Sequence, residues 1–119
     1  MSDRRRHRRV GLVRQIDIAP LRRRGKSNGL LVNISRSGLE MYHQDRLQEG
    51  SELIVRLVFM DEDGVEKPEV ISGKVKWVHP LSDQYAAGIE FRDLNERDHF
   101  MLLAYIEYAE GFEHKPLTE

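Results

Sequence analysis

The sequence of 119 residues contains no cysteine. Disulfide bonds, thiolate metal ligands and cysteine nucleophiles are therefore excluded, and the fold must rest on packing alone. Long apolar runs are also missing, because the most apolar stretch, residues 53–60, is interrupted by Arg56 and is far too short to span a bilayer. The N-terminus lacks the apolar stretch of a secretory signal, so we expect a cytoplasmic protein that does not insert into a membrane.

Patterns that indicate catalysis or metal binding are equally scarce. The five histidines show no spacing typical of metal ligands. Residues 25–27 read Gly-Lys-Ser, but Pro20 stands where a phosphate-binding loop requires its first glycine. The acidic residues at 61–63 cluster in a turn, where a solvated loop explains them better than acid–base catalysis. We therefore expect no enzyme, no metal and no cofactor.

The net charge of −1 hides a strong asymmetry along the chain. Residues 1–26 contain nine arginines and one lysine against two aspartates, a net charge of +8, so the remainder of the chain carries −9. A local basic segment on an otherwise acidic protein favours a compact anionic partner over nucleic acid, which usually meets basic residues spread along a face. A nucleic-acid-binding tail remains open at this point.

Short apolar stretches with alternating polar residues predict a β-rich fold. We expect strands at residues 10–18, 30–34, 38–42, 52–60, 70–78 and 85–91, with Pro20 after the first, turns at 22–29 and 61–64, and a break at 79–80. Within the fifth strand, Ile71, Gly73, Val75 and Trp77 are expected on one side or near it. Strands spaced by about 8–12 residues argue for a sandwich or small barrel, mostly antiparallel, rather than for βαβ units.

The C-terminal region predicts one helix. Asn95, with Asp98 three residues later, is typical of a helix N-cap, and Gly111 is expected to end the helix. Apolar residues recur at helical spacing between them and are expected to cover an open end or face of the sheet structure: Met101, Leu102, Tyr105, Ile106 and Ala109. The predicted organisation is a flexible arm at 1–9, one domain at 10–111 and a loose tail at 112–119.

Two polar segments suggest ligand chemistry. Residues 3–9 are an acid followed by an arginine-dense run, and residues 33–38, Asn-Ile-Ser-Arg-Ser-Gly, form a bend between two expected strands. Arginine offers planar forks that match phosphate oxygens and the O6/N7 edge of guanine, and its face stacks on a purine. The bend offers an amide, two hydroxyls and a glycine, which allow short contacts and close backbone approach. A guanine nucleotide fits both segments.

These segments resemble the PilZ domain family, which is marked by Arg-x-x-x-Arg and, after a spacer, Asp/Asn-x-Ser-x-x-Gly. The first element is matched by Arg5 with Arg9 or by Arg4 with Arg8, and the former register is preferred because Arg9 directly precedes the expected first strand. The second element is matched by Asn33, Ser35 and Gly38. Residues 88–91, Gly-Ile-Glu-Phe, resemble the Gly-x-x-Phe stretch of the last strand in the family. The resemblance implies a mainly β fold, a small antiparallel barrel of about six strands with the N-terminal arm and one C-terminal α-helix.

The resemblance also implies a bacterial receptor for the second messenger cyclic di-GMP. Arg5 and Arg9 would hold guanine and phosphate groups, while Asn33, Ser35 and Gly38 would contact the ligand from the barrel. An arginine directly before the motif, here Arg4, implies two intercalated ligand molecules per chain. The secondary candidates are Arg6, Arg8, Arg36, Ser37, Trp77 and Gly88. Solvation is an equally good explanation for Arg6 and Arg8, and a core or rim position is the better one for Trp77.

The expected mechanism is an arm that orders on the ligand and so presents a changed surface to a downstream protein, whose identity the sequence does not indicate. A monomer is expected. Two alternatives remain: a nucleic-acid-binding module that uses the basic arm, and a PilZ-like domain that binds no ligand and only mediates protein contacts.

Overall fold

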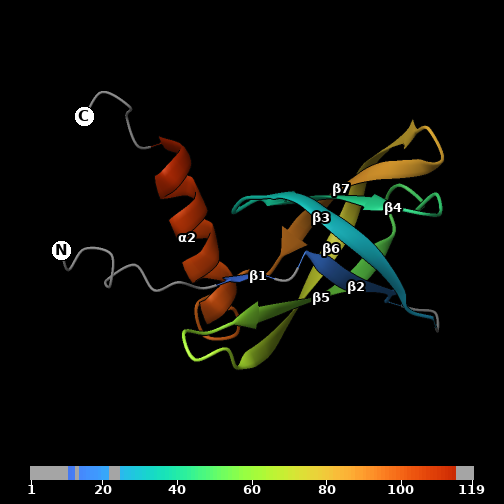
Figure 1. Cartoon of the computed structure of the whole chain (residues 1–119). Helices are drawn as coiled ribbons and strands as arrows, with labels where there is room; N and C mark the ends of the chain where they lie inside the picture. The colour runs from blue at the N-terminus through green and yellow to red at the C-terminus, as the bar shows by residue number, and fades with distance from the viewer. Residues whose placement is uncertain (1–10, 13, 22–24, 115–119) are drawn as a thin grey trace.

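A computed structural model describes residues 11, 12, 14–21 and 25–114 of the chain. The elements are β1 (Gly11–Leu12), β2 (Gln15–Pro20), β3 (Ser27–Ile34), β4 (Gly38–His43), β5 (Glu52–Met60), β6 (Glu66–Leu81), β7 (Gln84–Arg92) and α2 (Phe100–His114). Six strands close into an antiparallel barrel in the order β2, β3, β4, β7, β6 and β5, and β5 pairs again with β2 (Figure 1). The predicted small antiparallel barrel with a C-terminal helix is confirmed. The predicted arm at 1–9 and the last five residues of the predicted tail lie outside the described residues.

The barrel interior is built by alternation of buried and exposed side chains, most regularly in β5. In β5 the side chains of Leu53, Val55, Leu57 and Phe59 are at most 4% exposed, whereas Arg56 between them points to solvent. Such alternation is what a strand with one buried face requires. All of the remaining barrel strands and α2 also contribute residues to the core: Ile16, Ile18, Leu31, Leu39, Met41, Ile71, Val75, Val78, Ala87, Ile89, Phe91, Leu102 and Ile106.

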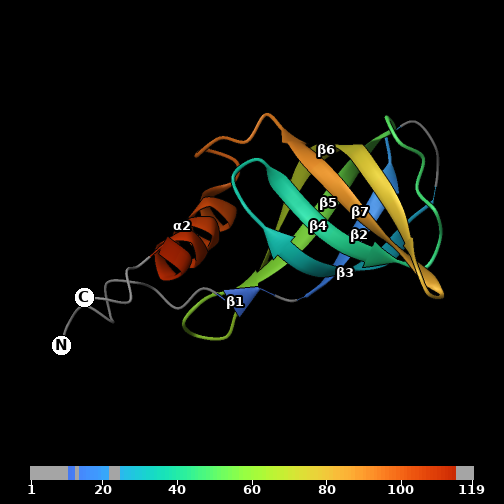
Figure 2. The same cartoon turned by 90° about the horizontal axis from the view of Figure 1, so that it is seen from above.

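Helix α2 lies against one end of the barrel, beside β1 and the turn that joins β3 to β4 (Figure 2). Leu102 and Ile106 are fully buried in the same cluster as the barrel core, and the ring of Tyr105 lies 6.3 Å from that of Phe59. Burying two such aliphatic side chains contributes about 1.5–3 kcal/mol each. The apolar stripe predicted for the helix therefore closes an end of the barrel, as expected.

The start of α2 is held by a strand that is distant in sequence. The backbone N–H groups of Met101 and Leu102 donate to the Glu69 carboxylate on β6, at 2.7 and 2.9 Å. Buried His99 accepts from the Asn95 N–H at Nδ1, so its Nε2–H donates to the carbonyl of Val70, 3.0 Å away. The prediction that Asn95 caps the helix is therefore correct only for the preceding turn, where its Oδ1 accepts from the Asp98 N–H at 2.8 Å.

The prediction that Gly111 ends the helix is wrong, because α2 continues through this residue to His114. Residues 112–114 of the predicted tail are thus helical. A glycine ends a helix when it adopts positive φ just beyond the last turn, and Gly111 is not among the glycines with positive φ in the described chain. Inside a helix a glycine costs only about 1 kcal/mol, which does not stop propagation.

The strand predicted at 70–78 is in fact β6, which starts at Glu66 and runs through His79 and Pro80 to Leu81. The predicted break is wrong because a proline interrupts a sheet only where its missing N–H would pair. Pro80 pairs with Tyr85 of β7, whereas the pairing of β6 with β5 ends at Lys74, so the other edge of β6 is unpaired there. Proline is tolerated on such an edge.

Two further boundaries differ from the sequence prediction. Ser27, Asn28 and Gly29 were expected in a turn but belong to β3, where they pair with residues 16–18 of β2. The first expected strand is divided into β1 and β2. Strand β1 pairs with the end of β5, whereas β2 pairs with the first half of β5 and with β3. In both cases strand pairing in the folded barrel sets the boundary that local sequence patterns placed elsewhere.

Candidate functional site

The turn between β3 and β4 carries the predicted polar residues and is held by its own hydrogen bonds. The Ser35 N–H donates to the Gly38 carbonyl at 2.8 Å, and the Ser37 N–H donates to Ser35 Oγ at 3.3 Å. The two serine hydroxyl oxygens lie 3.0 Å apart. The carbonyl of Ser37 accepts from the Phe91 N–H of β7 at 2.9 Å. The backbone of the turn is thus fixed while both hydroxyls stay at the surface.

Gly38 has a structural reason to be glycine. A Cβ at this position would lie 1.9 Å from the carbonyl oxygen of Ile89 and 3.0 Å from Cα of Glu90. Both are backbone atoms of β7, which no rotamer change can move. The glycine of the predicted motif therefore brings β4 against β7, and this role exists with or without a ligand.

A β-bulge decides which way Asn33 faces. Leu31 pairs with Met41, but Asn33 pairs with Glu40, so Val32 is an extra residue in β3. An unbulged ladder would place Val32 opposite Glu40 and turn Asn33 toward the barrel interior with Leu39. The bulge instead exposes Asn33, whose Oδ1 accepts from the Ile34 N–H at 2.9 Å. No hydrogen bond from its Nδ2 to another residue occurs within the described part of the chain.

A second bulge turns Trp77 to the same outer face. Val75 pairs with Ile89 and Trp77 pairs with Gly88, so Lys76 is the extra residue. The expectation that Val75 and Trp77 share a side is therefore wrong. The Trp77 ring lies over β7, since a Cβ at Gly88 would meet its Nε1 at 2.3 Å, and it stacks on the His79 ring with centroids 4.9 Å apart.

These two bulges align four positions in one row across the outside of the barrel. Directly paired residues of neighbouring antiparallel strands share a face. Asn33 pairs with Glu40, Glu40 with Gly88, and Gly88 with Trp77. With strands about 4.8 Å apart, the backbone of Trp77 lies roughly 14 Å from that of Asn33 along the sheet. The structure thus places the secondary candidates Gly88 and Trp77 on the same face as Asn33, but two and three strands away from it, respectively.

Arg36, at the tip of the turn, contacts α2. Its Nη2 lies 3.4 Å from Oε2 of Glu107, and both side chains are more than half exposed. An ion pair as exposed as this contributes little to stability. It does show that the motif turn and the helix lie within side-chain reach of each other.

The arginines of the first motif element, Arg4, Arg5 and Arg9, and the neighbouring Arg6 and Arg8 lie outside the described residues. The structure does describe β1, which follows this segment and pairs with the end of β5 near α2.

The sequence prediction missed Arg14. Arg14 lines a pocket together with Asn33. It stands two and four residues before Ile16 and Ile18, which are buried in the barrel, so the alternating pattern of the sequence could have drawn attention to it. A charge in such a series is expected only where the barrel opens to solvent.

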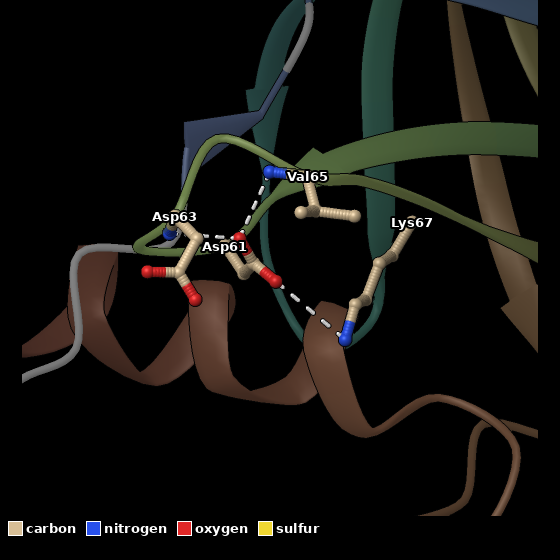
Figure 3. A network of polar contacts seen from close by, with 4 residues as sticks. All are labelled: Asp61, Asp63, Val65 and Lys67. Atoms are coloured by element: carbon tan, nitrogen blue, oxygen red, sulfur yellow. Dashed lines mark hydrogen bonds and ion pairs between the residues drawn. The ribbon is translucent and has the colours of Figure 1, made fainter.

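In the acidic turn at 61–64, the carboxylate of Asp61 forms its contacts within the hairpin itself (Figure 3). Oδ1 of Asp61 accepts from the Val65 and Asp63 N–H groups, each at 2.9 Å, and Oδ2 lies 3.6 Å from Lys67 Nζ. The hydrogen bond from the Val65 N–H is the main cause that holds the pKa of Asp61 below its usual range. Desolvation opposes it, but the hydrogen bond from the Asp63 N–H and the charge of Lys67 add to the lowering. This cluster organises the hairpin between β5 and β6.

Across the ranges 11–12, 14–21 and 25–114, no group of three or more histidine, aspartate or glutamate side chains could hold a metal ion. Nor does this part of the chain contain a helix with the length and apolar character needed to cross a membrane.

Comparison with known proteins gives one family and a structural neighbour. The family model described as PilZ domain matches residues 3–108. No curated protein matches the sequence. The solved structure of the Bacillus subtilis inhibitor of motility (MotI/DgrA) is similar with a TM-score of 0.61 and 19% sequence identity, covering 92% of this chain and 53% of that one. The chain therefore spans about half the length of this neighbour, and the likeness concerns the fold.

Proposed function

The chain belongs to the PilZ domain family, and from this premise we propose that it is a receptor for cyclic di-GMP, a binding protein rather than an enzyme. The observation that carries the proposal is that the matched span contains both motif elements in order, with Asn33, Ser35 and Gly38 at and beside the single turn that joins β3 to β4. The alternative of a domain without ligand is disfavoured because neither element is substituted at a motif position.

The chemistry of the ligand suits these residues. Cyclic di-GMP carries two phosphodiester charges and two guanines, and arginine forks match both groups. The hydroxyls of Ser35 and Ser37 lie at the surface, so they can turn toward phosphate oxygens at little cost. Hydrogen bonds to charged groups contribute about 1.5–3 kcal/mol each, so three or four account for micromolar affinity.

The proposed signal is a change in how the arginine segment meets the barrel. The ligand would bridge Arg5 and Arg9 to the turn at 33–38 and so hold the segment against β1 and the barrel end. Ordering a segment on binding costs about 2–5 kcal/mol of the gross interaction, which the charge-assisted contacts offset. The resulting surface is what a downstream protein would recognise, in a monomeric receptor located in the bacterial cytoplasm.

Isothermal titration with cyclic di-GMP tests the proposal, with cyclic di-AMP and GTP as control ligands. We expect saturable binding of cyclic di-GMP at micromolar concentration or below and at least tenfold weaker binding of both controls. Repeating the titration between 50 and 200 mM salt separates this function from nucleic-acid binding. A polyanion held by six to ten cations loses about three to five orders of magnitude in affinity over this range, and a ligand with two charges loses far less. Absence of cyclic di-GMP binding would overturn the proposal.

Substitution of Arg9 tests the motif itself. Arg9→Ala is expected to weaken cyclic di-GMP by tenfold or more, because one or two charge-assisted contacts are lost. Arg97→Ala, a loss of the same charge in the turn before α2, is the matched control and should bind like the wild type. The thermal midpoint of ligand-free Arg9→Ala should equal that of the wild type; a large decrease would assign Arg9 a structural role instead.

Arg4 carries a separate hypothesis about stoichiometry. We expect two ligand molecules per chain, since Arg4 directly precedes the motif, and Arg4→Leu should reduce the number to one while keeping the first site. Calorimetric stoichiometry at saturating cyclic di-GMP measures this directly. One ligand per wild-type chain contradicts the two-molecule hypothesis but leaves the receptor function intact.

A further inference from the structure

The motif turn and helix α2 are joined by an ion pair between two exposed side chains. Nη2 of Arg36 donates to Oε2 of Glu107 over 3.4 Å, and the two side chains are 53% and 68% exposed. The contact spans 71 residues of sequence, because α2 lies beside the turn that joins β3 to β4 (Figure 2). Arg36 stands between Ser35 and Ser37, the two residues whose hydroxyls are proposed to meet the ligand phosphates.

The backbone around Arg36 is held in place, so a change of partner involves its side chain. The Ser35 N–H donates to the Gly38 carbonyl at 2.8 Å, and the Ser37 carbonyl accepts from the Phe91 N–H of β7 at 2.9 Å. The Arg36 side chain, in contrast, is more than half exposed. An exposed arginine has many rotamers, so its guanidinium can turn from the helix toward the serine hydroxyls while the turn itself stays fixed.

The ion pair is weak enough to be exchanged for a ligand contact. Charge-assisted hydrogen bonds between nitrogen and oxygen are typically about 2.7–2.9 Å long, so 3.4 Å is a loose contact. Exposed pairs gain little, because both charges remain hydrated and ordering two long side chains costs entropy. A phosphodiester offers two oxygens that match the guanidinium fork, and at this turn two serine hydroxyls would hold the same group. The phosphate is therefore the stronger partner.

The position of this ion pair differs from that of others on the barrel. Three other ion pairs join neighbouring strands or residues of one hairpin: Arg56–Asp17, Lys76–Glu90 and Lys67–Asp61. Breaking one of them leaves its two strands joined by backbone hydrogen bonds. The Arg36–Glu107 pair instead joins a helix to the turn that carries the motif, so its exchange changes a contact at the proposed ligand site.

Resting on the proposed function, we infer that Arg36 changes partner on binding, from Glu107 of α2 in the free protein to a phosphate of the cyclic dinucleotide. Glu107 then competes with the ligand for the same guanidinium, and the contact is autoinhibitory. The affinity of the receptor is set partly by a residue of the helix that does not touch the ligand. Loss of Glu107 should therefore strengthen binding, the opposite of what is expected for a residue that supports the site.

A double-mutant cycle, measured by calorimetric titration with cyclic di-GMP at 50 mM salt, tests this exchange. Arg36→Ala should weaken binding about tenfold, because a charge-assisted contact is lost. Glu107→Gln should strengthen binding by about 1.5- to 5-fold, which is the range that an exposed ion pair can contribute. In the Arg36→Ala background the same Glu107→Gln change should have little effect, since no guanidinium is left to release.

Asp17→Asn is the matched control. It removes one carboxylate from an arginine with a similarly loose contact, 3.5 Å from Arg56, but between strands β2 and β5 rather than at the motif turn. It should bind cyclic di-GMP like the wild type. Both Arg36 and Glu107 are more than half exposed, so their variants should fold normally, and thermal midpoints measured without ligand verify this.

Three results would overturn the exchange while the receptor function stands. Unchanged binding by Arg36→Ala would show that Arg36 does not meet the ligand. Unchanged or weaker binding by Glu107→Gln would show that Glu107 does not withhold Arg36 from the ligand. An equal gain from Glu107→Gln in both backgrounds would reduce its effect to repulsion between its charge and the phosphates. If the wild-type protein binds no cyclic di-GMP, the proposed function fails and this inference fails with it.

Discussion

Two hairpin turns of this barrel are rich in polar side chains, but they use them differently. In the turn between β5 and β6, one oxygen of the Asp61 carboxylate accepts hydrogen bonds from two backbone N–H groups of the hairpin, and the other forms an ion pair with Lys67. In the turn between β3 and β4, the Ser35 and Ser37 hydroxyls contact each other and the Asn33 amide keeps its donors. The first turn thus uses both oxygens of its central carboxylate internally, whereas the second leaves the Asn33 amide nitrogen without a hydrogen bond among the described residues.

The glycines of the two turns should differ most in stability. Gly38→Ala is expected to destabilise the barrel by about 3 kcal/mol or more, because the added Cβ would lie 1.9 Å from a backbone oxygen of β7. Gly64→Ala meets nothing within 4 Å but must adopt φ near +81°, at a cost of about 1 kcal/mol. Urea denaturation of both variants measures the difference. Equal destabilisation would show that close approach to β7 is not what requires Gly38.

The serines should affect affinity far more than stability. Ser35→Ala is expected to weaken cyclic di-GMP by about tenfold, since a hydroxyl that would contact the charged ligand is removed. Ser51→Ala removes a hydroxyl that donates to the Gln48 carbonyl in another turn, and it should leave binding unchanged. Parallel titrations and thermal midpoints separate the two effects. Loss of stability without loss of affinity in Ser35→Ala would make both turns structural.

The acidic turn should produce the smallest effect, and one that depends on pH. Its hydrogen bonds lower the pKa of Asp61 in the folded state. The carboxylate therefore stabilises the fold above the unfolded pKa of about 3.9, and this contribution is lost as pH falls through the lower folded pKa. Asp61→Asn should reduce the thermal midpoint at pH 7, and the difference from wild type should shrink in acid.

Asp63→Asn removes the same charge from the same turn and provides the control. Its side chain does not accept the hairpin hydrogen bonds, so it should show a smaller difference at pH 7. A difference between Asp61→Asn and wild type that stays constant down to pH 2 would contradict the assignment of the pKa effect to the folded hairpin.

Strong local patterns were predicted well. The limits of β5, Glu52–Met60, follow from an uninterrupted alternating stretch, and the apolar stripe of α2 follows from its helical spacing. The turn at 61–64 was predicted from its composition and lies between β5 and β6. Two of the failures occur where tertiary context decides the outcome, at Pro80 on an unpaired edge and at the helix start held by Glu69.

The sequence by itself determined which residues form the two motif elements, because motif order and side-chain chemistry are properties of the chain. It also determined the mainly β barrel and the helix that closes one end. Only the tertiary structure decided where these residues face. One extra residue in β3 and another in β6 turn Asn33 and Trp77 from the core to the outer surface, because a shift of one residue in pairing reverses the side of every residue that follows.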